Sequence, residues 1–183
     1  ESHSRLVSFF IMKNYVEIKK KIKPFKKILK IEGDKSLSIR WALLASQASG
    51  KSTSYNLLKS EDVLSTLYCL KKLGLKVYIF KNKCEIISKG LNSFNYKRNL
   101  ILDAGNSGTL SRLILGLLVH SKSNIKIIGD KSLSKRDFLR IINPLKKFGA
   151  TFKSNNGKLP INIKGTNFPK PIKYFENKGS AQC

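Results

Sequence analysis

Apolar residues recur along the chain with two different spacings, and the alternation of these spacings predicts strands that alternate with helices. Within the first ninety residues the pattern also contains helix signals, with Ser60 as an N-cap and Gly74 as a terminating glycine. The elements predicted here are a strand over 27–32, a helix over 37–46, a strand over 53–58, a helix over 61–73, and strands over 77–80 and 84–88.

The same order of elements returns in the second half of the chain. The elements predicted there are a strand over 99–103, a helix from about 108 to 118, a strand over 124–128, a helix over 134–148, and strands over 150–153 and 159–164. A third copy opens with a predicted strand over 172–175 and reaches Gly179 near the last residue.

Glycines at equivalent places in this order give the period of the repeat. Gly33 and Gly105 are 72 residues apart, and Gly105 and Gly179 are 74 residues apart. A period of this length, with this order of elements, predicts repeated βαβαββ units. The expected fold class is therefore α/β, with the third unit truncated.

Composition supports a folded protein and narrows its chemistry. The chain of 183 residues is 41% hydrophobic and 26% charged, which favours a packed core over disorder. No apolar run approaches the roughly 18 residues of a membrane span. Three cysteines without motif spacing and only two histidines argue against a disulfide framework and a zinc site. We expect a soluble, cytoplasmic protein that holds no metal.

The net charge of +25 raises the question of a polyanionic partner. Thirty of the 36 basic residues are lysines, spread over nearly the whole chain, and only six are arginines. Base readout and bidentate phosphate contacts favour arginine, and no aromatic residues alternate with the basic ones as in a stacking platform. A lysine-rich solvated surface explains the charge better than nucleic-acid binding.

Three predicted helix starts combine glycine with hydroxyl or amide side chains, at equivalent places in the repeat. The segments are 33–36 with Arg40 nearby, 105–109 with Arg112 nearby, and 179–182. Unpaired amides and the helix dipole at such starts favour an anion, and a nearby arginine adds full charge. Each segment alone is an ordinary cap or turn. Because three occur in register, we predict that they face a common anionic ligand.

An acid–base pair is not evident beside these helix starts. The acidic residues Asp34, Asp62 and Asp103 are interpreted as cap or turn residues rather than as paired carboxylates. The sequence therefore predicts anion binding without naming a catalytic acid or base.

Five segments, in the same order, resemble the EPSP synthase family, the 3-phosphoshikimate 1-carboxyvinyltransferases. They are GDKSLSIRWALLAS at 33–46, LDAGNSGTLSRLILGLL at 102–118, GDKSLSKRDFLRIINPLKKFGA at 129–150, KLPINIKG at 158–165 and KGSAQ at 178–182. The resemblance runs from about residue 13 to residue 182. It implies the enolpyruvyl transferase fold, an inverse α/β barrel in which each of two domains contains three βαβαββ units.

The resemblance also implies a domain assignment. Residues 12–33 would form the opening strand of the first domain, and 34–183 two units and the start of a third in the second domain. Residues 1–11 precede Met12, match nothing in the family and are interpreted as sequence upstream of the native protein. We expect this chain to be inactive alone, because the family's reaction site lies between both domains, and the full-length enzyme to be monomeric.

The reaction implied by the resemblance transfers the enolpyruvyl group of phosphoenolpyruvate to the 5-hydroxyl of shikimate 3-phosphate, with release of phosphate. This step belongs to chorismate and aromatic amino acid biosynthesis, and it uses no cofactor. Its partners would be these two small molecules, with no nucleic acid and no membrane. The inhibitor glyphosate occupies the phosphoenolpyruvate pocket in this family.

The resemblance assigns site residues by position. Lys35, the expected catalytic residue, would touch both substrates, while Ser36 and Arg40 would hold the shikimate carboxylate. The phosphoenolpyruvate pocket would be lined by Asn106, Gly108 and Thr109, with Arg136 binding the phosphate. The segment Ser180, Ala181 and Gln182 would contact shikimate 3-phosphate, and Gln182 also phosphoenolpyruvate. Arg112 matches the family too, and its role stays open between ligand binding and structure.

Two other functions remain as alternatives. One is an enolpyruvyl transferase acting on UDP-N-acetylglucosamine, which generally uses a loop cysteine, whereas Cys69 and Cys84 fall outside such a loop. The other is an RNA-binding or RNA-end-processing protein on similar units, which would account for the charge.

Overall fold

The computed structural model describes residues 24, 26–29, 31–176 and 179. The chain divides into two compact units, Glu1–Ile31 and Glu32–Cys183. The elements described below all lie in the second unit. The domain boundary expected near residue 33, and the interpretation of residues 1–11, stay predictions.

The first half of the second unit has two helices and a three-stranded antiparallel sheet with the order β1-β3-β2. Its elements are α1 (Lys35–Ala45), β1 (Ser49–Tyr55), α2 (Glu61–Lys72), β2 (Lys76–Ile79) and β3 (Lys83–Lys89). Gly74 follows α2 with a φ of 92°, as a terminating glycine requires.

The second half repeats this arrangement with one more strand. Its elements are β4 (Leu100–Asp103), α3 (Gly108–Leu117), η1 (Leu118–His120), β5 (Ile125–Ile128), η2 (Leu133–Lys135), α4 (Leu139–Phe148), β6 (Thr151–Asn155) and β7 (Lys158–Lys164). The sheet order is β4-β5-β7-β6, and β4 pairs with β5 in parallel. Because β5-β7-β6 matches β1-β3-β2, the predicted repeat is confirmed in the topology itself.

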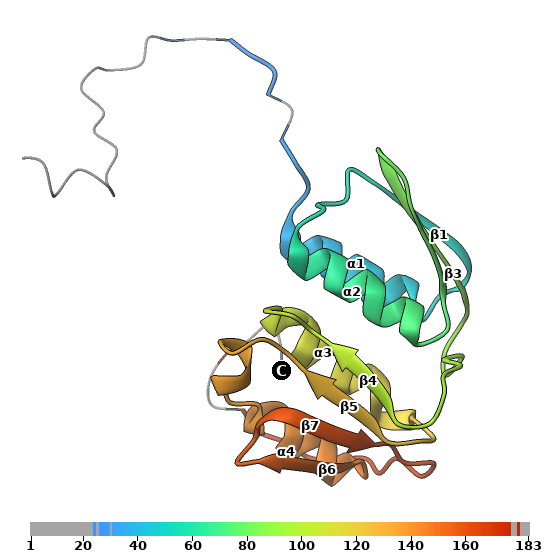
Figure 1. Ribbon diagram of the computed structural model, residues 1–183, viewed down its shortest axis with the longest axis vertical. Coiled ribbons are helices and arrows are strands. Elements are labelled where there is room, and N and C mark those ends of the chain that lie inside the picture. Colours follow the sequence, from blue (N-terminus) through green and yellow to red (C-terminus); the bar gives the residue numbers. More distant parts are fainter. Residues whose placement is uncertain (1–23, 25, 30, 177–178, 180–183) are drawn as a thin grey trace, which may run out of the picture. The chain divides into compact units, whose positions relative to one another are not determined.

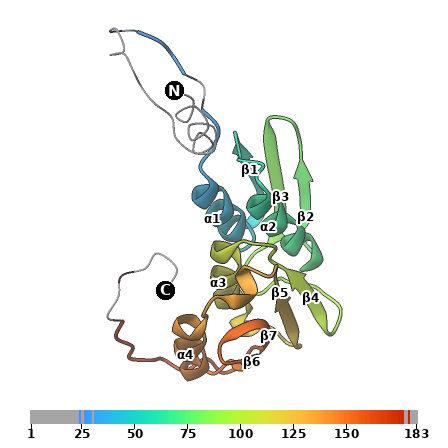
Figure 2. The same ribbon diagram turned by 60° about the vertical axis from the view of Figure 1, so that its left-hand side comes forward.

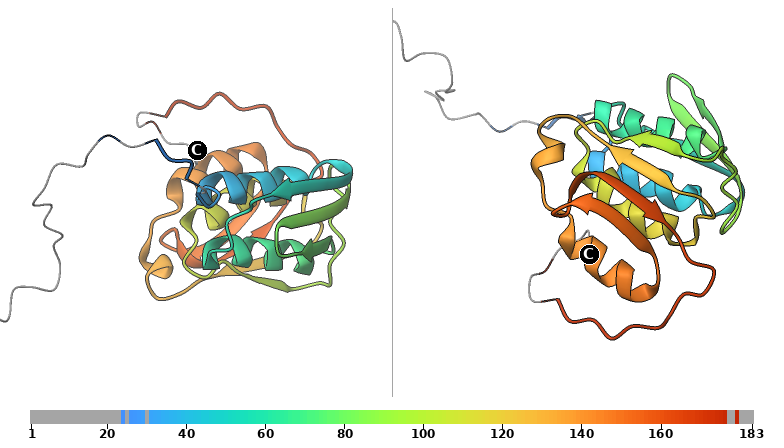
Figure 3. Two further views of the ribbon diagram at one scale, coloured as in Figure 1. Left: turned by 90° about the horizontal axis from the view of Figure 1, so that it is seen from above. Right: turned by 60° about the horizontal axis from the view of Figure 1, so that its bottom comes forward.

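The helices lie against the sheets of their own halves and against one another. Figure 1 shows α1 and α2 beside the sheet of β1 and β3, and the view from above in Figure 3 shows the two helices side by side. Helix α1 also contacts α3, and α3 contacts α4, which lies beside β6 (Figure 2). One continuous cluster of buried apolar residues joins both halves, so the two repeats share a single core.

Two predicted strands are wrong for the residues that the structure describes. Among 27–32 and 172–175, no described residue belongs to a strand. Their apolar side chains are largely exposed, with Ile28 at 96% and Phe175 at 86%. A strand needs a neighbouring strand for its backbone groups, and neither segment belongs to one of the two sheets of the described residues.

Two other predictions were wrong in their limits. The strand expected over 53–58 is β1, which begins four residues earlier because its register is set by pairing with β3 rather than by its own polar sequence. The helix expected over 134–148 is divided into η2 and α4, with Arg136 extended between them at φ −74° and ψ 150°. The Asp137 carboxylate accepts a hydrogen bond from the Leu139 amide (2.8 Å), which stabilises the turn before α4.

Within the described residues, no helix combines the length and the apolar character that crossing a membrane requires.

Candidate functional site: an anion pocket at the start of helix α3

The N-terminus of α1 is capped by a carboxylate. Asp34 Oδ1 accepts a hydrogen bond from the Leu37 amide at 2.7 Å, which confirms its prediction as a cap residue. The next residue, Lys35, begins the helix and extends its side chain away from it. Because Asp34 already places negative charge at this helix end, the α1 dipole is partly compensated before any ligand arrives.

The N-terminus of α3 is capped by a neutral hydroxyl. Ser107 is fully buried, and its Oγ accepts a hydrogen bond from the Leu110 amide at 3.2 Å. The turn before it is tight, with Gly105 at a φ of 55° and its amide donating to Asp103 Oδ1 at 2.8 Å. Asp103 is the last residue of β4, and its carboxylate holds this turn. The first-turn amides of α3 carry the positive end of the dipole, and the capping group adds no negative charge.

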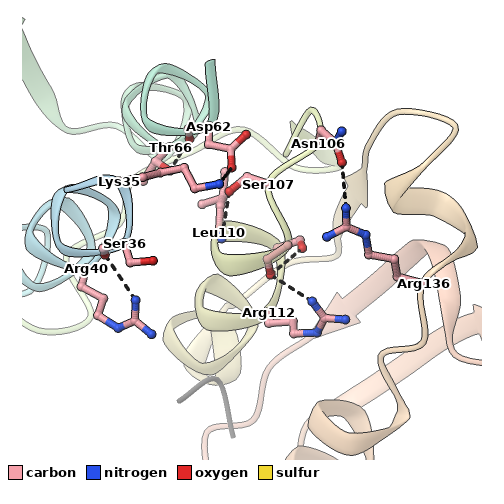
Figure 4. A network of polar contacts seen from close by, with 12 residues as sticks. Lys35, Ser36, Arg40, Asp62, Thr66, Asn106, Ser107, Leu110, Arg112 and Arg136 are labelled. Carbon is pink, nitrogen blue, oxygen red and sulfur yellow. Dashed lines mark hydrogen bonds and ion pairs between the residues drawn. The ribbon is translucent and has the colours of Figure 1, made fainter. Parts of the chain in front are cut away.

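The segment between η2 and α4 carries Arg136 toward the start of α3. Its Nη2 donates a hydrogen bond to Asn106 Oδ1 at 3.1 Å, as Figure 4 shows. The guanidinium also lies close to Gly108, because a Cβ built on this glycine would be 2.8 Å from Arg136 Nη1 and 3.0 Å from Arg112 Nη1. A side chain at this position would therefore meet both guanidinium groups, which would have to shift to accommodate it.

A hollow of about 380 Å³ lies where these groups meet, and it is lined by Lys35, Asp62, Asn106, Gly108, Thr109, Arg112 and Arg136. Of the residues predicted for the phosphoenolpyruvate pocket, all those that the structure describes line this one hollow. A separate hollow of about 540 Å³, near the end of α3, contains none of the predicted site residues.

Asp62 has a contact that the sequence does not indicate. It lies in the first turn of α2, and its Oδ2 is 3.2 Å from Lys35 Nζ (Figure 4). Asp62 is therefore more than a helix-start residue, because among the described residues it is the one carboxylate that lines the pocket. No spacing in the sequence indicates this pair, since the contact depends on how α1 packs beside α2.

The Lys35–Asp62 ion pair serves orientation more than stability. The side chain of Lys35 is 52% exposed and that of Asp62 is 21% exposed, and ion pairs of this exposure contribute little to folding. The carboxylate nevertheless limits the positions that a long lysine side chain can take. The ammonium is thus kept beside the pocket, where it can contact an anion.

The residues predicted to bind shikimate carboxylate do not line this pocket. Ser36 and Arg40 lie on α1, where Arg40 Nη1 donates to the Ser36 carbonyl at 3.3 Å (Figure 4). The predictions for Ser180, Ala181 and Gln182 lie outside the described residues.

Three cations and one carboxylate give the pocket a net positive lining. Such a lining, at a helix start with a neutral cap, suits a compact, multiply charged anion such as a phosphate ester. Among the described residues, no group of three or more His, Cys, Asp or Glu side chains could hold a metal ion.

The two described cysteines are buried away from this chemistry. Cys69 lies in α2 and its thiol donates to the Asp103 carbonyl at 3.3 Å, while Cys84 lies in β3. Burial raises the pKa of the Cys69 thiol to about 12 and raises that of Cys84 as well. Neither thiol is thus set up to act as a nucleophile or an acid near neutral pH.

A sequence model of the family described as EPSP synthase (3-phosphoshikimate 1-carboxyvinyltransferase) matches residues 19–183. The chain is 45% identical over 154 residues to the 3-phosphoshikimate 1-carboxyvinyltransferase of Ruthia magnifica and 44% identical over 155 residues to that of Vesicomyosocius okutanii. Each alignment covers 84% of this chain but 35% of the relative.

Among solved structures, EPSP synthase from Acinetobacter baumannii superposes with a TM-score of 0.78 at 33% sequence identity. That superposition covers 84% of this chain and 35% of the other. The expected fold class, repeated βαβαββ units of the enolpyruvyl transferase type, is thereby confirmed. The matched motifs include the segments that build the pocket at the start of α3, and the chain belongs to the EPSP synthase family.

Proposed function

We propose that this chain supplies the phosphoenolpyruvate half-site of a 3-phosphoshikimate 1-carboxyvinyltransferase. The observation that supports this most strongly is the joint lining of one pocket by Lys35, Asn106, Gly108, Thr109 and Arg136. These residues come from two repeats and from three separate motifs.

In this proposal the pocket holds the phosphate and carboxylate charges of phosphoenolpyruvate. Arg136 and the start of α3 bind the phosphate, while Lys35 lies between the two substrates. The 5-hydroxyl of shikimate 3-phosphate adds to the carbon that bears the enol oxygen while the methylene carbon takes up a proton, giving a tetrahedral intermediate with a methyl group. Phosphate then leaves with the bridging oxygen as the methyl group loses a proton, which restores the double bond in the product. Cations around that phosphate stabilise the charge that develops as the bond breaks.

The other substrate would be held from a neighbouring surface. Ser36 and Arg40 bind the shikimate carboxylate in this proposal, and Ser180, Ala181 and Gln182 contact its phosphate side. The proposed protein is cytoplasmic, needs no cofactor and is monomeric at full length.

The test uses this chain completed to the full length of its relatives, called the full-length enzyme below. We expect it to release one phosphate and form one enolpyruvyl product per turnover, detected by phosphate assay and mass spectrometry. Arg136→Gln should raise the KM for phosphoenolpyruvate on the order of a hundredfold, since a charged hydrogen-bonding partner is lost. Arg140→Gln is the matched control, because Arg140 pairs with Glu176 outside the pocket.

An enzyme without carboxyvinyl transfer, or with equal effects of both substitutions, would refute this proposal. Specificity for the acceptor is checked by offering UDP-N-acetylglucosamine in place of shikimate 3-phosphate. Transfer to UDP-N-acetylglucosamine is not expected, because Cys69 and Cys84 are buried and neither can serve as the loop cysteine of that enzyme class. The net charge of +25 keeps RNA binding as a second candidate. Titration with an unrelated RNA over a salt series separates it, because binding to RNA weakens steeply with salt.

A further inference from the structure

Arg112 connects the start of α3 to the segment that carries Arg136. Its Nη1 donates to the Gly108 carbonyl at 3.4 Å, and its Nη2 donates to the Asp137 carbonyl at 3.2 Å. Gly108 is the first residue of α3, and Asp137 directly follows Arg136. One guanidinium thus spans two segments that are 25 or more residues apart in sequence.

The same guanidinium lies over a fixed aromatic ring. Arg112 Cζ is 4.9 Å from the ring centre of Phe138, and Phe138 is fully buried. The backbone of Phe138 is held in turn, because its amide donates to the Gly157 carbonyl at 2.9 Å. The ring therefore provides a rigid surface against which the guanidinium is held.

Arg136 lies between η2 and α4, and its amide donates to the Leu133 carbonyl at 3.0 Å at the end of η2. Its backbone is extended between η2 and α4, and its side chain is exposed. Ordering a long exposed arginine costs side-chain entropy when a ligand binds. A contact that fixes Asp137, the next residue, restricts the orientations of the Arg136 side chain before the ligand binds, so that less entropy is lost on binding.

We propose that Arg112 is a positioning residue, which holds the Arg136 segment against α3 so that the Arg136 guanidinium is oriented toward the bound anion. This inference rests on the proposed function for the identity of the anion. It assigns a role to a residue for which sequence comparison leaves ligand binding and structure equally open.

A substitution by lysine can distinguish the charge of Arg112 from the planar shape of its guanidinium. A lysine at position 112 keeps the positive charge of the pocket, but it has neither a planar face for Phe138 nor a rigid fork for two carbonyls. If Arg112 acts through its charge on the ligand, Arg112→Lys should keep an affinity for phosphoenolpyruvate close to that of the wild type, whereas Arg112→Gln should lose affinity. If Arg112 acts by position, both variants lose affinity to a similar degree.

The kinetic test uses the full-length enzyme. We expect Arg112→Lys and Arg112→Gln each to raise the KM for phosphoenolpyruvate about tenfold to a hundredfold, as misplacement of a binding group does, with the KM for shikimate 3-phosphate changed less than about twofold. Phe138→Leu should act in the same direction, because it removes the ring and leaves every charge in place. Arg140→Lys is the matched control on α4, outside the pocket.

A second measurement does not depend on activity. Hydrogen exchange of the backbone over 130–138 is followed by mass spectrometry, with and without inorganic phosphate. We expect Arg112→Lys to speed exchange there on the order of tenfold, since the Asp137 carbonyl contact is lost, whereas Arg140→Lys leaves it unchanged.

The outcomes separate this inference from the proposed function. An inactive wild type refutes the function, and the exchange measurement still decides whether Arg112 holds the segment. An active wild type with an unchanged KM in Arg112→Lys, or with unchanged exchange over 130–138, overturns the inference. If Arg112→Lys does not fold, Phe138→Leu decides in its place, and an unaltered KM in that variant overturns it equally.

Discussion

The starts of α1 and α3 occupy equivalent places in the repeat, yet the residues that cap them differ in charge. Asp34 caps α1 with a carboxylate, and Ser107 caps α3 with a hydroxyl. Two arginines approach the α3 start, whereas Lys35, the first residue of α1, pairs with Asp62 of α2. The pocket forms at α3, and α1 contributes a single lysine to it.

This difference shows that equivalent elements of a repeat need not form equivalent sites. Both helix starts offer amides and a dipole, but a negatively charged cap reduces the attraction of the dipole for an anion. We therefore propose that the ligand binds at the α3 start, where the pocket lies, while the α1 start contributes the ammonium of Lys35 to the same pocket. Substitutions at the two helix starts should accordingly differ both in the quantity that they change and in the size of the change.

The largest effect is expected at Lys35, the one residue that links the two helix starts. Lys35→Met should lower kcat of the full-length enzyme about a hundredfold to a thousandfold, because a charge aimed at the reacting group is lost. Lys153→Met is the control, since Lys153 is an exposed lysine on β6. Steady-state kinetics measures both, and comparable losses in the two variants would refute a special role for the α1 start.

A substitution at Gly108 tests how closely Arg136 and the ligand must approach the start of α3. An alanine Cβ would lie 2.8 Å from Arg136 Nη1, so the arginine would have to move. We expect a cost of about 1–3 kcal/mol, or roughly tenfold to a hundredfold in affinity. The longer inhibitor glyphosate should lose more affinity than phosphoenolpyruvate does. Inhibition constants that are equal before and after Gly108→Ala would show that this glycine serves the turn alone.

Arg40 tests whether the α1 helix binds the second substrate. Arg40→Lys should raise the KM for shikimate 3-phosphate on the order of tenfold, because a lysine cannot make a planar two-point contact with a carboxylate. The melting temperature should hardly change, since Arg40 is only partly buried. A large fall in melting temperature with an unaltered KM would instead make Arg40 a structural residue.

The smallest effect is expected at Asp34, and it concerns stability. Asp34→Ala leaves the Leu37 amide without its acceptor, which should cost about 1 kcal/mol, or roughly 2–4 °C in melting temperature. The KM for phosphoenolpyruvate should change far less than in Gly108→Ala. Calorimetry and kinetics on the two variants test this, and a large KM effect at Asp34 would remove the contrast between the two helix starts.

Sequence patterns predicted most elements because helices and short strands are determined by local spacing and by caps. Ser107 caps α3 within the predicted helix start at 105–109, and the predicted repeat of elements is seen again in the sheet order that β1-β3-β2 and β5-β7-β6 share. Prediction failed where pairing between strands sets the limits of an element, as in β1, whose limits follow those of its partner β3. It also failed at 134–148, where an apolar helical spacing hides the extended break at Arg136.

By itself, then, the sequence determined the repeat, the helix starts and the family, because these depend on residue spacing along one chain. The tertiary structure decided which helix start holds the pocket, since that depends on contacts between segments far apart in sequence. The Lys35–Asp62 pair requires α1 to pack beside α2, and the Arg112 contact to the Asp137 carbonyl requires α3 to meet the loop before α4. No local pattern encodes either contact, because both arise from packing in the shared core.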